Sequence, residues 1–417
     1  MAHGVRVGVV GCARILPAHL RGMAALRAAG MDNFRVTALC ARDRRDAESF
    51  RKRGEGPPPR PPVAAPPDPL GAPHMYVSDL HEDTLPALYT DLREMLDADV
   101  VDALLVLTPV YLHHSHVIAG LRAGKHVLVE KPMAITVRAA RLMVEAAHAA
   151  GRVLGIAEVV RYIPDVRATS WLVQQGILGD VQLYVSGGLG TADWSPNKVV
   201  ANTPWRHQKL QAGGGPTVDM AVHLFDGVRC HAGEVVEVSG MVTTQEAQRH
   251  IFGPDGLPQT SVRNEVEDAF MATFRLANGG MGQLFFSWAC HGQPVQLEGR
   301  TAIYGSRGCL KGETLLLDDG TQGPAARIAW ERADQTARAG FQPHGLDDPF
   351  AIQFLDFLNA IEGGGAMQVD GREGLRDLAA AYAILESATA HRAVSVDDVA
   401  SGAVRAYQEE IDRHYGL

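Results

Sequence analysis

The hydrophobic pattern of the first 155 residues alternates between short apolar runs and longer stretches with apolar residues at helical spacing. Short runs that are almost wholly apolar are typical of strands buried on both faces of a parallel sheet. We expect such strands at residues 5–10, 35–40, 101–107, 126–129 and 153–156, with helices between them, as at 115–123 and 137–150. This order predicts a doubly wound parallel α/β sheet in a first domain, residues 1–155.

The pattern changes after residue 156. Strands are predicted at 181–186, 235–242, 267–276, 280–288, 301–305 and 314–317, several of them separated by turn signals such as Asn278-Gly279. So many strands with few helices between them favour a large, mostly antiparallel open sheet. Helices with apolar stripes follow at 349–362 and 373–391. Because 417 residues exceed one ordinary core, we expect a second α/β domain over residues 156–417.

One segment of the first domain interrupts the alternation. Nine of the eighteen residues from Gly56 to Pro73 are proline. Proline lacks the backbone N–H that a central strand or helix requires, so residues 54–74 are predicted to form a polyproline-like surface excursion. The segment is either an arm that docks a partner or a tolerated insertion. The second interpretation is favoured, because lengthening a surface loop costs little entropy.

Composition narrows the class of protein. Hydrophobic residues make up 46% and charged residues 21%, which is typical of a packed globular chain. The net charge of -9 argues against nucleic acid as the main partner. No apolar run reaches the ~20 residues of a membrane span, so no membrane partner is expected. The five cysteines form no CxxC pair, and no signal peptide is recognised before the first strand; both favour a cytoplasmic location.

The turn after the first strand, Gly11-Cys12-Ala13-Arg14-Ile15-Leu16, has features of a dinucleotide site. A glycine at the strand end permits a tight turn, and a small residue lets the backbone approach a pyrophosphate. The helix that follows then offers free N–H groups to the anion. Two glycines of the GxGxxG pattern are absent, so an ordinary strand–helix turn is the alternative.

The end of the second strand bears on the choice of cofactor. NAD sites usually place an acidic residue there to bind the ribose hydroxyls, whereas this chain has Ala41-Arg42-Asp43. Arg42 could pair with the 2′-phosphate of NADP, which favours NADP over NAD. In the alternative, Arg42 is a solvated surface charge and Asp43 serves the ribose.

Two further constellations carry candidate chemistry. In Glu130-Lys131-Pro132 the lysine follows a parallel strand, where open α/β sheets bind ligands. After a glycine run at 213–215, Asp219 and His223 lie four residues apart on an expected helix, so both project from one face. Oxidising a secondary alcohol requires removal of its hydroxyl proton, which histidine can accept near neutral pH. The alternatives are a surface lysine and an Asp–His pair that only supports the helix.

Short motifs follow one another along the chain in a characteristic order. They are Gly11-Cys12-Ala13-Arg14-Ile15, Thr108-Pro109 with His113, Ala123-Gly124-Lys125-His126-Val127, Glu130-Lys131-Pro132, Arg161-Tyr162 with Pro164, Trp205-Arg206, Gly214-Gly215 with Asp219 and His223, and Gly371-Arg372-Glu373-Gly374-Leu375 with Ser387. With them the chain resembles the glucose–fructose oxidoreductase, inositol dehydrogenase and MocA (Gfo/Idh/MocA) family along nearly its whole length. It departs from the family at Ala13, Leu16 and Ala221, where glycine is usual, and at Val110, where asparagine is common.

The resemblance implies a Rossmann domain followed by an α/β domain whose open sheet often serves oligomerisation. We therefore expect a homodimer or homotetramer formed through the C-terminal sheet, and a small polyhydroxylated substrate. Lys131, Asp219 and His223 would form the catalytic set, with Lys131 holding the nicotinamide carboxamide and a reacting hydroxyl, and His223 acting as general base.

The remaining predicted site residues follow from the resemblance together with the turns described above. The cofactor-binding set is Gly11, Cys12, Ala13, Arg14, Ile15, Ala41, Arg42, Thr108, Pro109, His113, Glu130 and Lys131. The substrate-binding set is Arg161, Tyr162, Trp205, Arg206, Asp219 and His223. His113, His114 and His116 form a dense patch, but no carboxylate or cysteine stands at ligand spacing beside it, so no metal is expected.

The function predicted from the sequence is NAD(P)-dependent hydride transfer between nicotinamide and a secondary alcohol or ketone carbon of a sugar, a sugar derivative or a cyclitol. One alternative is a glycosidase that uses NAD for transient oxidation and elimination. Another is a non-catalytic regulator that senses the cofactor. The presence of Lys131, Asp219 and His223 argues against the regulator.

Overall fold

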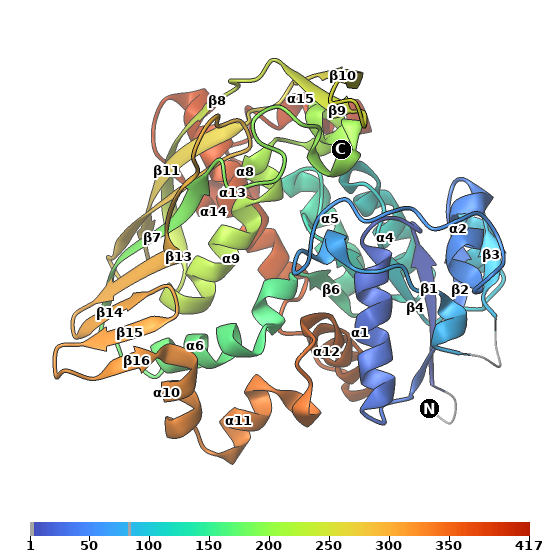
Figure 1. Cartoon of the computed structure of the whole chain (residues 1–417), viewed down its shortest axis with the longest axis horizontal. Coiled ribbons are helices and arrows are strands. Elements are labelled where there is room, and N and C mark those ends of the chain that lie inside the picture. The colour runs from blue at the N-terminus through green and yellow to red at the C-terminus, as the bar shows by residue number, and fades with distance from the viewer. Residues whose placement is uncertain (1–3, 82–84) are drawn as a thin grey trace. The chain divides into compact units, whose positions relative to one another are not determined.

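The computed structural model describes residues 4–81 and 85–417 (Figure 1). The chain divides into two compact units. Unit 1 consists of Met1–Ala134, Ala139–Tyr162 and Gln342–Gly374, and unit 2 of Ile135–Arg138, Ile163–Phe341 and Leu375–Leu417. This division differs from a boundary after residue 155, because the chain returns to unit 1 at residue 342.

Unit 1 is built on a six-stranded parallel sheet, which confirms the predicted doubly wound fold. In sheet order its strands are β3 (Ala87–Tyr89), β2 (Phe34–Cys40), β1 (Val5–Val10), β4 (Ala103–Val106), β5 (His126–Glu130) and β6 (Leu154–Ala157). The strand order reverses between β1 and β4, and ligands of open α/β sheets bind at the carboxyl ends of strands at such a point. Only the short edge strand β3 was not predicted.

Helices connect these strands. They are α1 (Leu16–Ala28), α2 (Arg44–Arg51), α3 (Leu92–Asp97), α4 (His113–Arg122), α5 (Val137–Ala150) and, from the later part of the chain, α12 (Pro349–Gly363). Short 3-10 turns lie at Pro69–Gly71, Val77–Asp79, Val110–Leu112 and Val159–Tyr162. Pro17 in the first turn of α1 favours a helix start, since its missing N–H would have no partner there.

Helix α12 explains why residues 342–374 belong to unit 1. It lies beside α1 (Figure 1), and a Cβ atom at Gly22 of α1 would lie only 2.6 Å from Phe350 Cβ. Asp348 caps α12 by accepting hydrogen bonds from the N–H groups of Phe350 and Ala351, at 2.9 and 3.2 Å. This close helix contact depends on tertiary packing, which the sequence pattern of α12 alone does not reveal.

The Pro-rich segment forms one 3-10 turn, Pro69–Gly71, and no strand or α-helix among its described residues. Its prolines are mostly exposed, as predicted for a surface excursion. Its end, however, enters the core: Ala72 packs with Ala18 of α1 and Phe350 of α12. The segment is therefore anchored on the α1 side of unit 1.

Unit 2 contains a nine-stranded sheet, which confirms the predicted large, mostly antiparallel sheet. Its order is β16 (Gln322–Pro324), β15 (Thr314–Leu317), β14 (Gly308–Lys311), β13 (Val295–Gly305), β7 (Val181–Leu189), β12 (Met281–Ser287), β11 (Ala269–Leu276), β8 (Val235–Thr243) and β17 (Val394–Ser395). Only the β7–β12 pair is parallel among the described strands of this sheet. A separate hairpin, β9 (Gln248–Phe252) with β10 (Pro258–Arg263), was not predicted.

Helices cover one face of the large sheet (Figure 1). Besides α12, the α-helices that follow residue 163 are α6 (Pro164–Gln174), α7 (Lys209–Ala212), α8 (Pro216–Asp219), α9 (Ala221–Ala232), α10 (Ala325–Arg332), α11 (Gln335–Phe341), α13 (Gly371–Ala390), α14 (Val396–Ser401) and α15 (Glu409–Tyr415). Helix α9 contacts β7, β8 and β12. In this layer Phe274 packs edge-on against Phe225 of α9, with ring centroids 5.9 Å apart.

The other face of the large sheet exposes apolar side chains. Strand β11 alternates buried and exposed residues, and its exposed Met271 pairs with Met241 of β8. Leu183 of β7 pairs with Met281 of β12 and Tyr304 of β13. The exposed fractions of these five side chains range from 45% for Tyr304 to 72% for Met241. Alternation on a sheet normally places polar residues outward, so this face is unusually apolar.

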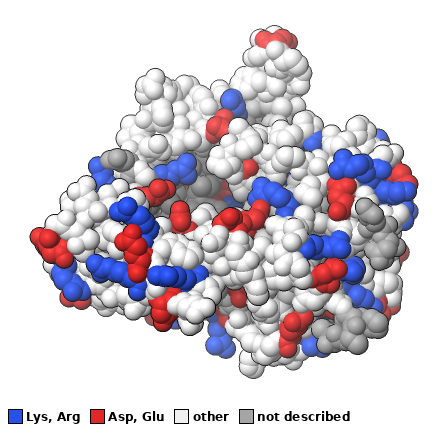
Figure 2. Space-filling view, turned by 60° about the horizontal axis from the view of Figure 1, so that its bottom comes forward, with Lys and Arg blue, Asp and Glu red and all other residues white. Residues whose placement is uncertain are grey.

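Two observations bear on nucleic acid and membranes as partners. On the face shown in Figure 2, basic and acidic side chains are interspersed, and no extended basic stripe is visible among the described residues. Among residues 4–81 and 85–417, no helix combines the length and the apolar character that crossing a bilayer requires.

Candidate active site

The β1–α1 turn fits the pyrophosphate of a dinucleotide. Gly11 has φ +100°, and a Cβ atom there would lie 2.8 Å from both Leu107 C and Thr108 N, so glycine is required for the turn to approach β4. Helix α1 begins at Leu16, whose N–H donates to the Ala13 carbonyl at 3.1 Å, and the N-cap Ile15 makes no side-chain cap. Ala13 and Leu16, where the family has glycine, are accommodated without breaking this turn.

The thiol of Cys12 is buried at the β1–α1 turn, and the predicted backbone contact of this residue with a cofactor stays a prediction. Its side chain is 3% exposed and its Sγ lies 4.0 Å from the carbonyl oxygen of Cys40. Burial, and then the neighbouring Cys40 and Asp46, raise the pKa of the Cys12 thiol, so the group is neutral at physiological pH. A small, uncharged side chain is what the close approach of a pyrophosphate needs at this position.

After the end of β2 the chain has an exposed arginine, Arg42, followed by an aspartate, Asp43, that caps the next helix. Ala41 is buried and Arg42 is exposed. Asp43 is the N-cap of α2, since its carboxylate accepts a hydrogen bond from Arg45 N at 2.9 Å. The carboxylate that could have served a ribose therefore has a structural role in the start of α2.

His113 supports two turns at the carboxyl edge of the sheet. Its Nε2 lies 2.7 Å from the carbonyl oxygen of Thr108, and its Nδ1 lies 3.0 Å from that of Pro132. Burial lowers the pKa of His113, while the contacts with the Thr108 and Pro132 carbonyl groups act in the opposite direction. With 1% of its surface exposed, His113 holds the Thr108-Pro109 turn against the Lys131-Pro132 turn. This supporting position differs from the predicted cofactor contact.

Glu130 is held beside Lys131 by a residue that sequence reasoning missed. One Glu130 oxygen lies 2.8 Å from Nε2 of His19 on α1, and the other accepts a hydrogen bond from Lys131 N at 3.1 Å. His19 is 3% exposed and packs edge-on against Phe350 at 4.9 Å. These contacts fix the backbone from which the Lys131 side chain extends. The Lys131–Pro132 peptide bond is cis.

Arg161 and Tyr162 lie in the 3-10 turn after β6. Tyr162 is fully buried and donates a hydrogen bond to Asp356 of α12 at 2.8 Å. Arg161 is 8% exposed, and its guanidinium lies 3.3 Å from the Glu373 carboxylate. Both side chains therefore tie this turn to the later part of unit 1. The predicted substrate contact of Tyr162 is not what its buried hydroxyl supports.

In unit 2 a glycine run leads into the helix that carries the acid–histidine pair. A Cβ atom at Gly213, which has φ +81°, would lie 2.4 Å from the Tyr382 hydroxyl, and one at Gly215 would lie 1.8 Å from the carbonyl oxygen of Glu267. The glycines are thus required by close packing. Sequence reasoning explained them only as a loop.

Glu267 holds the start of this helix. Its Oε1 accepts hydrogen bonds from Gly215 N at 2.8 Å and Thr217 N at 3.1 Å. The side chain is 5% exposed, and burial raises its pKa to about 6. A carboxylate here satisfies two N–H groups that a helix N-terminus leaves open. No local pattern identified Glu267, which lies fifty-two residues from Gly215.

Asp219 and His223 lie on two short helices rather than on one. α8 ends at Asp219 and α9 begins at Ala221, with Met220 between them at φ −110° and ψ −36°. Because this backbone is close to helical, the two side chains still lie about one turn apart.

Of the predicted substrate-side residues, Arg206 lies beside Asp219. Arg206 Nε lies 3.8 Å from Asp219 Oδ2, and its guanidinium stacks 4.4 Å from the centre of the Trp205 ring. The turn that carries them is held by His207, whose Nε2 accepts a hydrogen bond from Val200 N at 3.1 Å. Burial lowers the pKa of His207 to about 4, which keeps the ring neutral for this role.

The histidine patch has no metal-like arrangement. Burial lowers the pKa of His116 to about 4, and its Nδ1 lies 3.3 Å from Thr108 Oγ1. Across residues 4–81 and 85–417, no three His, Cys, Asp or Glu side chains are grouped as metal ligands.

The structure thus assembles the predicted residues in two groups. Unit 1 places Gly11, Thr108 and Lys131 at the carboxyl ends of β1, β4 and β5. Unit 2 places Arg206, Asp219 and His223 around the start of α9. That the two groups converge on one substrate stays a prediction.

Two family models match the chain. One, described as an oxidoreductase family with an NAD-binding Rossmann fold, matches residues 5–158. The other, described as the GFO/IDH/MocA C-terminal domain, matches residues 166–311. Together they extend from β1 to β14 and include every predicted site residue except Arg161 and Tyr162, which lie between the two matches.

Three characterised proteins are similar over most of their length. 1,5-Anhydro-D-fructose reductase from Ensifer adhaerens is 28% identical over 312 residues, which cover 74% of this chain and 84% of the relative. Levoglucosan dehydrogenase from Pseudarthrobacter phenanthrenivorans is 27% identical over 344 residues, with 75% and 84% covered. Myo-inositol 2-dehydrogenase from Thermotoga maritima is 24% identical over 337 residues, with 78% and 91% covered.

A solved structure shows the same fold. Levoglucosan dehydrogenase in complex with NADH and L-sorbose superposes with a TM-score of 0.70 and 22% identity, covering 94% of this chain and 99% of that one.

Proposed function

Because this chain belongs to the Gfo/Idh/MocA family of oxidoreductases, we propose that it transfers a hydride between a nicotinamide dinucleotide and a secondary alcohol or ketone carbon of a sugar, a sugar derivative or a cyclitol. The observation that carries the proposal is the pairing of a glycine turn that fits a pyrophosphate with an acid–histidine pair at the start of α9. The relatives named above are a reductase and two dehydrogenases whose names refer to polyhydroxylated rings.

The chemistry requires a hydride and a proton to leave the same alcohol. A bound nicotinamide supplies the hydride acceptor, or the donor in the reverse direction. We assign the proton to the His223 imidazole, because histidine can gain and lose a proton near neutral pH. The Lys131 ammonium donates a hydrogen bond to the reacting oxygen and stabilises the negative charge that develops there. These three elements give a complete proton and hydride balance.

Asp219 and Arg206 would position the proton acceptor and the substrate. The Asp219 carboxylate, one turn before His223, orients the imidazole or accepts a hydrogen bond from a neighbouring sugar hydroxyl. Arg206 attracts this carboxylate across 3.8 Å and is itself restrained by stacking on Trp205. An aromatic ring beside a carboxylate suits a sugar, which has both apolar C–H faces and hydroxyl groups.

For the cofactor we propose NADP in preference to NAD. The support is local charge at the end of β2: Arg42 is exposed, while the Asp43 carboxylate is engaged in capping α2. An NAD site normally keeps its carboxylate for the ribose hydroxyls, whereas a 2′-phosphate is stabilised by a guanidinium.

We also propose that two copies associate through the apolar face of the large sheet. Met241 and Met271 form one exposed apolar pair on β8 and β11, and Leu183, Met281 and Tyr304 form a second group on β7, β12 and β13 of the same sheet. An apolar sheet face of this kind is stable in water only when covered, and an identical face on a second copy meets that need with two-fold symmetry. Residues 156–417 would then serve both the substrate and oligomerisation.

A cytoplasmic location stays a prediction from the sequence, supported by five cysteines that are all free in the structure.

The reaction is tested by a screen of cyclitols, aldoses and glycosides with NAD and with NADP. The proposal expects net formation of reduced nicotinamide with at least one polyhydroxylated substrate. A glycosidase with a transient redox step would instead cleave a glycoside with no net change in the cofactor. Failure of both dinucleotides to bind or react would reject the proposal.

A further inference from the structure

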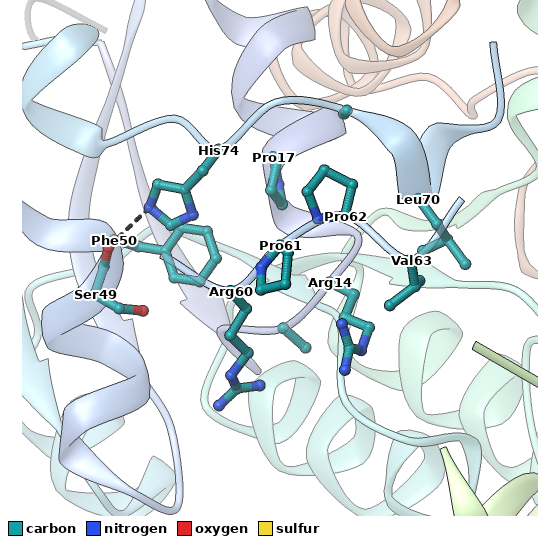
Figure 3. A pocket seen from close by; sticks show the side chains of 12 residues that line it. Arg14, Pro17, Ser49, Phe50, Arg60, Pro61, Pro62, Val63, Leu70 and His74 are labelled. Carbon is teal, nitrogen blue, oxygen red and sulfur yellow. Dashed lines mark hydrogen bonds between the residues drawn. The ribbon is translucent and has the colours of Figure 1, made fainter. Parts of the chain in front are cut away.

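A hollow separates the Pro-rich segment from the β1–α1 turn. The segment contributes Arg60 and Pro61 to its wall, and the turn with α1 contributes Ala13, Arg14 and Pro17 (Figure 3). The hollow holds about 410 Å³ of space, part of it open to solvent. Because this volume includes open solvent, the hollow is an open surface feature rather than an enclosed pocket, and Arg60 at its edge is 54% exposed and can meet a ligand from solvent.

The segment is closed on itself by specific internal contacts. Asp68 accepts a hydrogen bond from Leu70 N at 2.8 Å, and Val63 N donates to the Leu70 carbonyl at 3.3 Å. A Cβ atom at Gly71 would lie 2.7 Å from Ala65 C, which shows how tightly the loop closes on itself. Proline also lowers the entropy lost when a chain is ordered. The segment is therefore built to hold one position.

Arg60 is the charged group that the segment brings to the turn. It forms an ion pair with Asp46 in the first turn of α2. Both charges act on the buried Cys12 thiol, whose pKa Asp46 raises and Arg60 lowers, after the larger effects of burial and Cys40. In Figure 3 the guanidinium groups of Arg14 and Arg60 point to the same side of the hollow.

We propose that the Pro-rich segment is a cofactor-binding arm, in which Arg60 binds a phosphate group of the dinucleotide beside the β1–α1 turn. The inference rests on the proposed function. A phosphate is a stronger partner for a guanidinium than a single carboxylate, because it offers more charge and more acceptor oxygens. Asp46 would hold Arg60 in place before the cofactor binds, and Arg60 would offset the repulsion between Asp46 and the phosphate.

A dinucleotide offers Arg60 two kinds of phosphate group, the 2′-phosphate and the pyrophosphate. Binding data show which of them Arg60 contacts. The 2′-phosphate is present only in NADP, whereas the pyrophosphate is present in both cofactors. The experiment is a calorimetric titration of full-length wild-type, R60Q and R53Q protein with NADPH and with NADH. R53Q is the matched control: Arg53 lies shortly before the prolines and, like Arg60, pairs with an aspartate, here Asp79, but it does not line the hollow.

We expect R60Q to weaken binding at least tenfold, the size expected for one hydrogen bond between charged groups, and R53Q to bind like wild type. A loss confined to NADPH identifies the 2′-phosphate, and an equal loss for both identifies the pyrophosphate; each supports the arm. R60K, which keeps the charge, should recover part of the affinity, and this separates charge from a folding defect. If R60Q binds both cofactors as R53Q does, or if R60K binds no better than a weakened R60Q, the arm is rejected. Wild-type protein that binds neither cofactor would reject the proposed function instead.

Discussion

Replacing Glu267 by Gln should raise the stability of the protein above pH 6 and leave it nearly unchanged in acid. Glu267 is buried and its pKa is raised from 4.5 to about 6 by desolvation. Glutamine keeps an oxygen that accepts from Gly215 N and Thr217 N but carries no charge. The variant therefore removes the buried charge while it keeps the cap at the start of α8.

The sign and size of this change in stability follow from proton linkage. Between pH 4.5 and about 6 the folded protein binds more protons at Glu267 than the unfolded chain does, so wild-type stability falls as pH rises through this window. Each pKa unit corresponds to ~1.4 kcal/mol, so the shift from 4.5 to about 6 corresponds to about 2 kcal/mol. E267Q, which cannot titrate, should become more stable than wild type by about this amount between acid and neutral pH.

The assay is the free energy of unfolding of both proteins in urea at a series of pH values across this window. A difference between them that stays flat with pH, or that falls as pH rises, would refute the reasoning. E267A provides a second comparison, because it leaves two buried N–H groups without an acceptor; it should cost about 2–4 kcal/mol in acid and less at neutral pH, where the stability of the wild type has fallen. Its turnover should fall as well, since the loosened helix start carries Asp219.

Three further predictions test other parts of the site. Gly11→Ala should abolish dinucleotide binding and lower stability by about 1–3 kcal/mol. Gly30 also has a positive φ but has open space around it, so Gly30→Ala should affect only stability. Calorimetry measures binding by the two variants, and thermal unfolding measures their stability. Arg42→Ala should weaken NADPH binding about tenfold or more and NADH binding little, and an equal loss of both would reverse the proposed preference. Met271→Lys should convert the oligomer to monomers in light scattering, while Leu257→Lys in the β9–β10 hairpin should not; unchanged assembly in both would reject the sheet face as the interface.

The sequence predicted the parts of the fold that depend on local pattern. Strands such as Val5–Val10 and helices such as Val137–Ala150 occur where the apolar periodicity places them. The β9–β10 hairpin was missed because its strand residues are mostly polar, for example in Pro258–Arg263. The return of α12 to unit 1 was missed because it depends on the close contact of Gly22 with Phe350.

The same distinction holds for the site. Lys131, Asp219 and His223 stand in short motifs, so their candidacy could be read from the chain. The residues that support them could not be predicted from the sequence. His19 and Glu130 are 111 residues apart, and Glu267 and Gly215 are 52 residues apart. Contacts between distant segments arise only from the packing of the folded chain, and an isolated His or Glu carries no pattern that marks such a role.

The central claim is that hydride transfer occurs with removal of the hydroxyl proton by His223. The most direct test is to measure the formation of reduced nicotinamide in a single turnover, with the substrate that the screen identifies. Wild type is compared with K131A and H223N, and with the controls K125A and H250N, which alter partly buried residues outside the predicted site. The account predicts rates at least ~100-fold lower in K131A and H223N, with dinucleotide affinity nearly unchanged and both controls like wild type. Wild-type rates of nicotinamide reduction in K131A and H223N would contradict it.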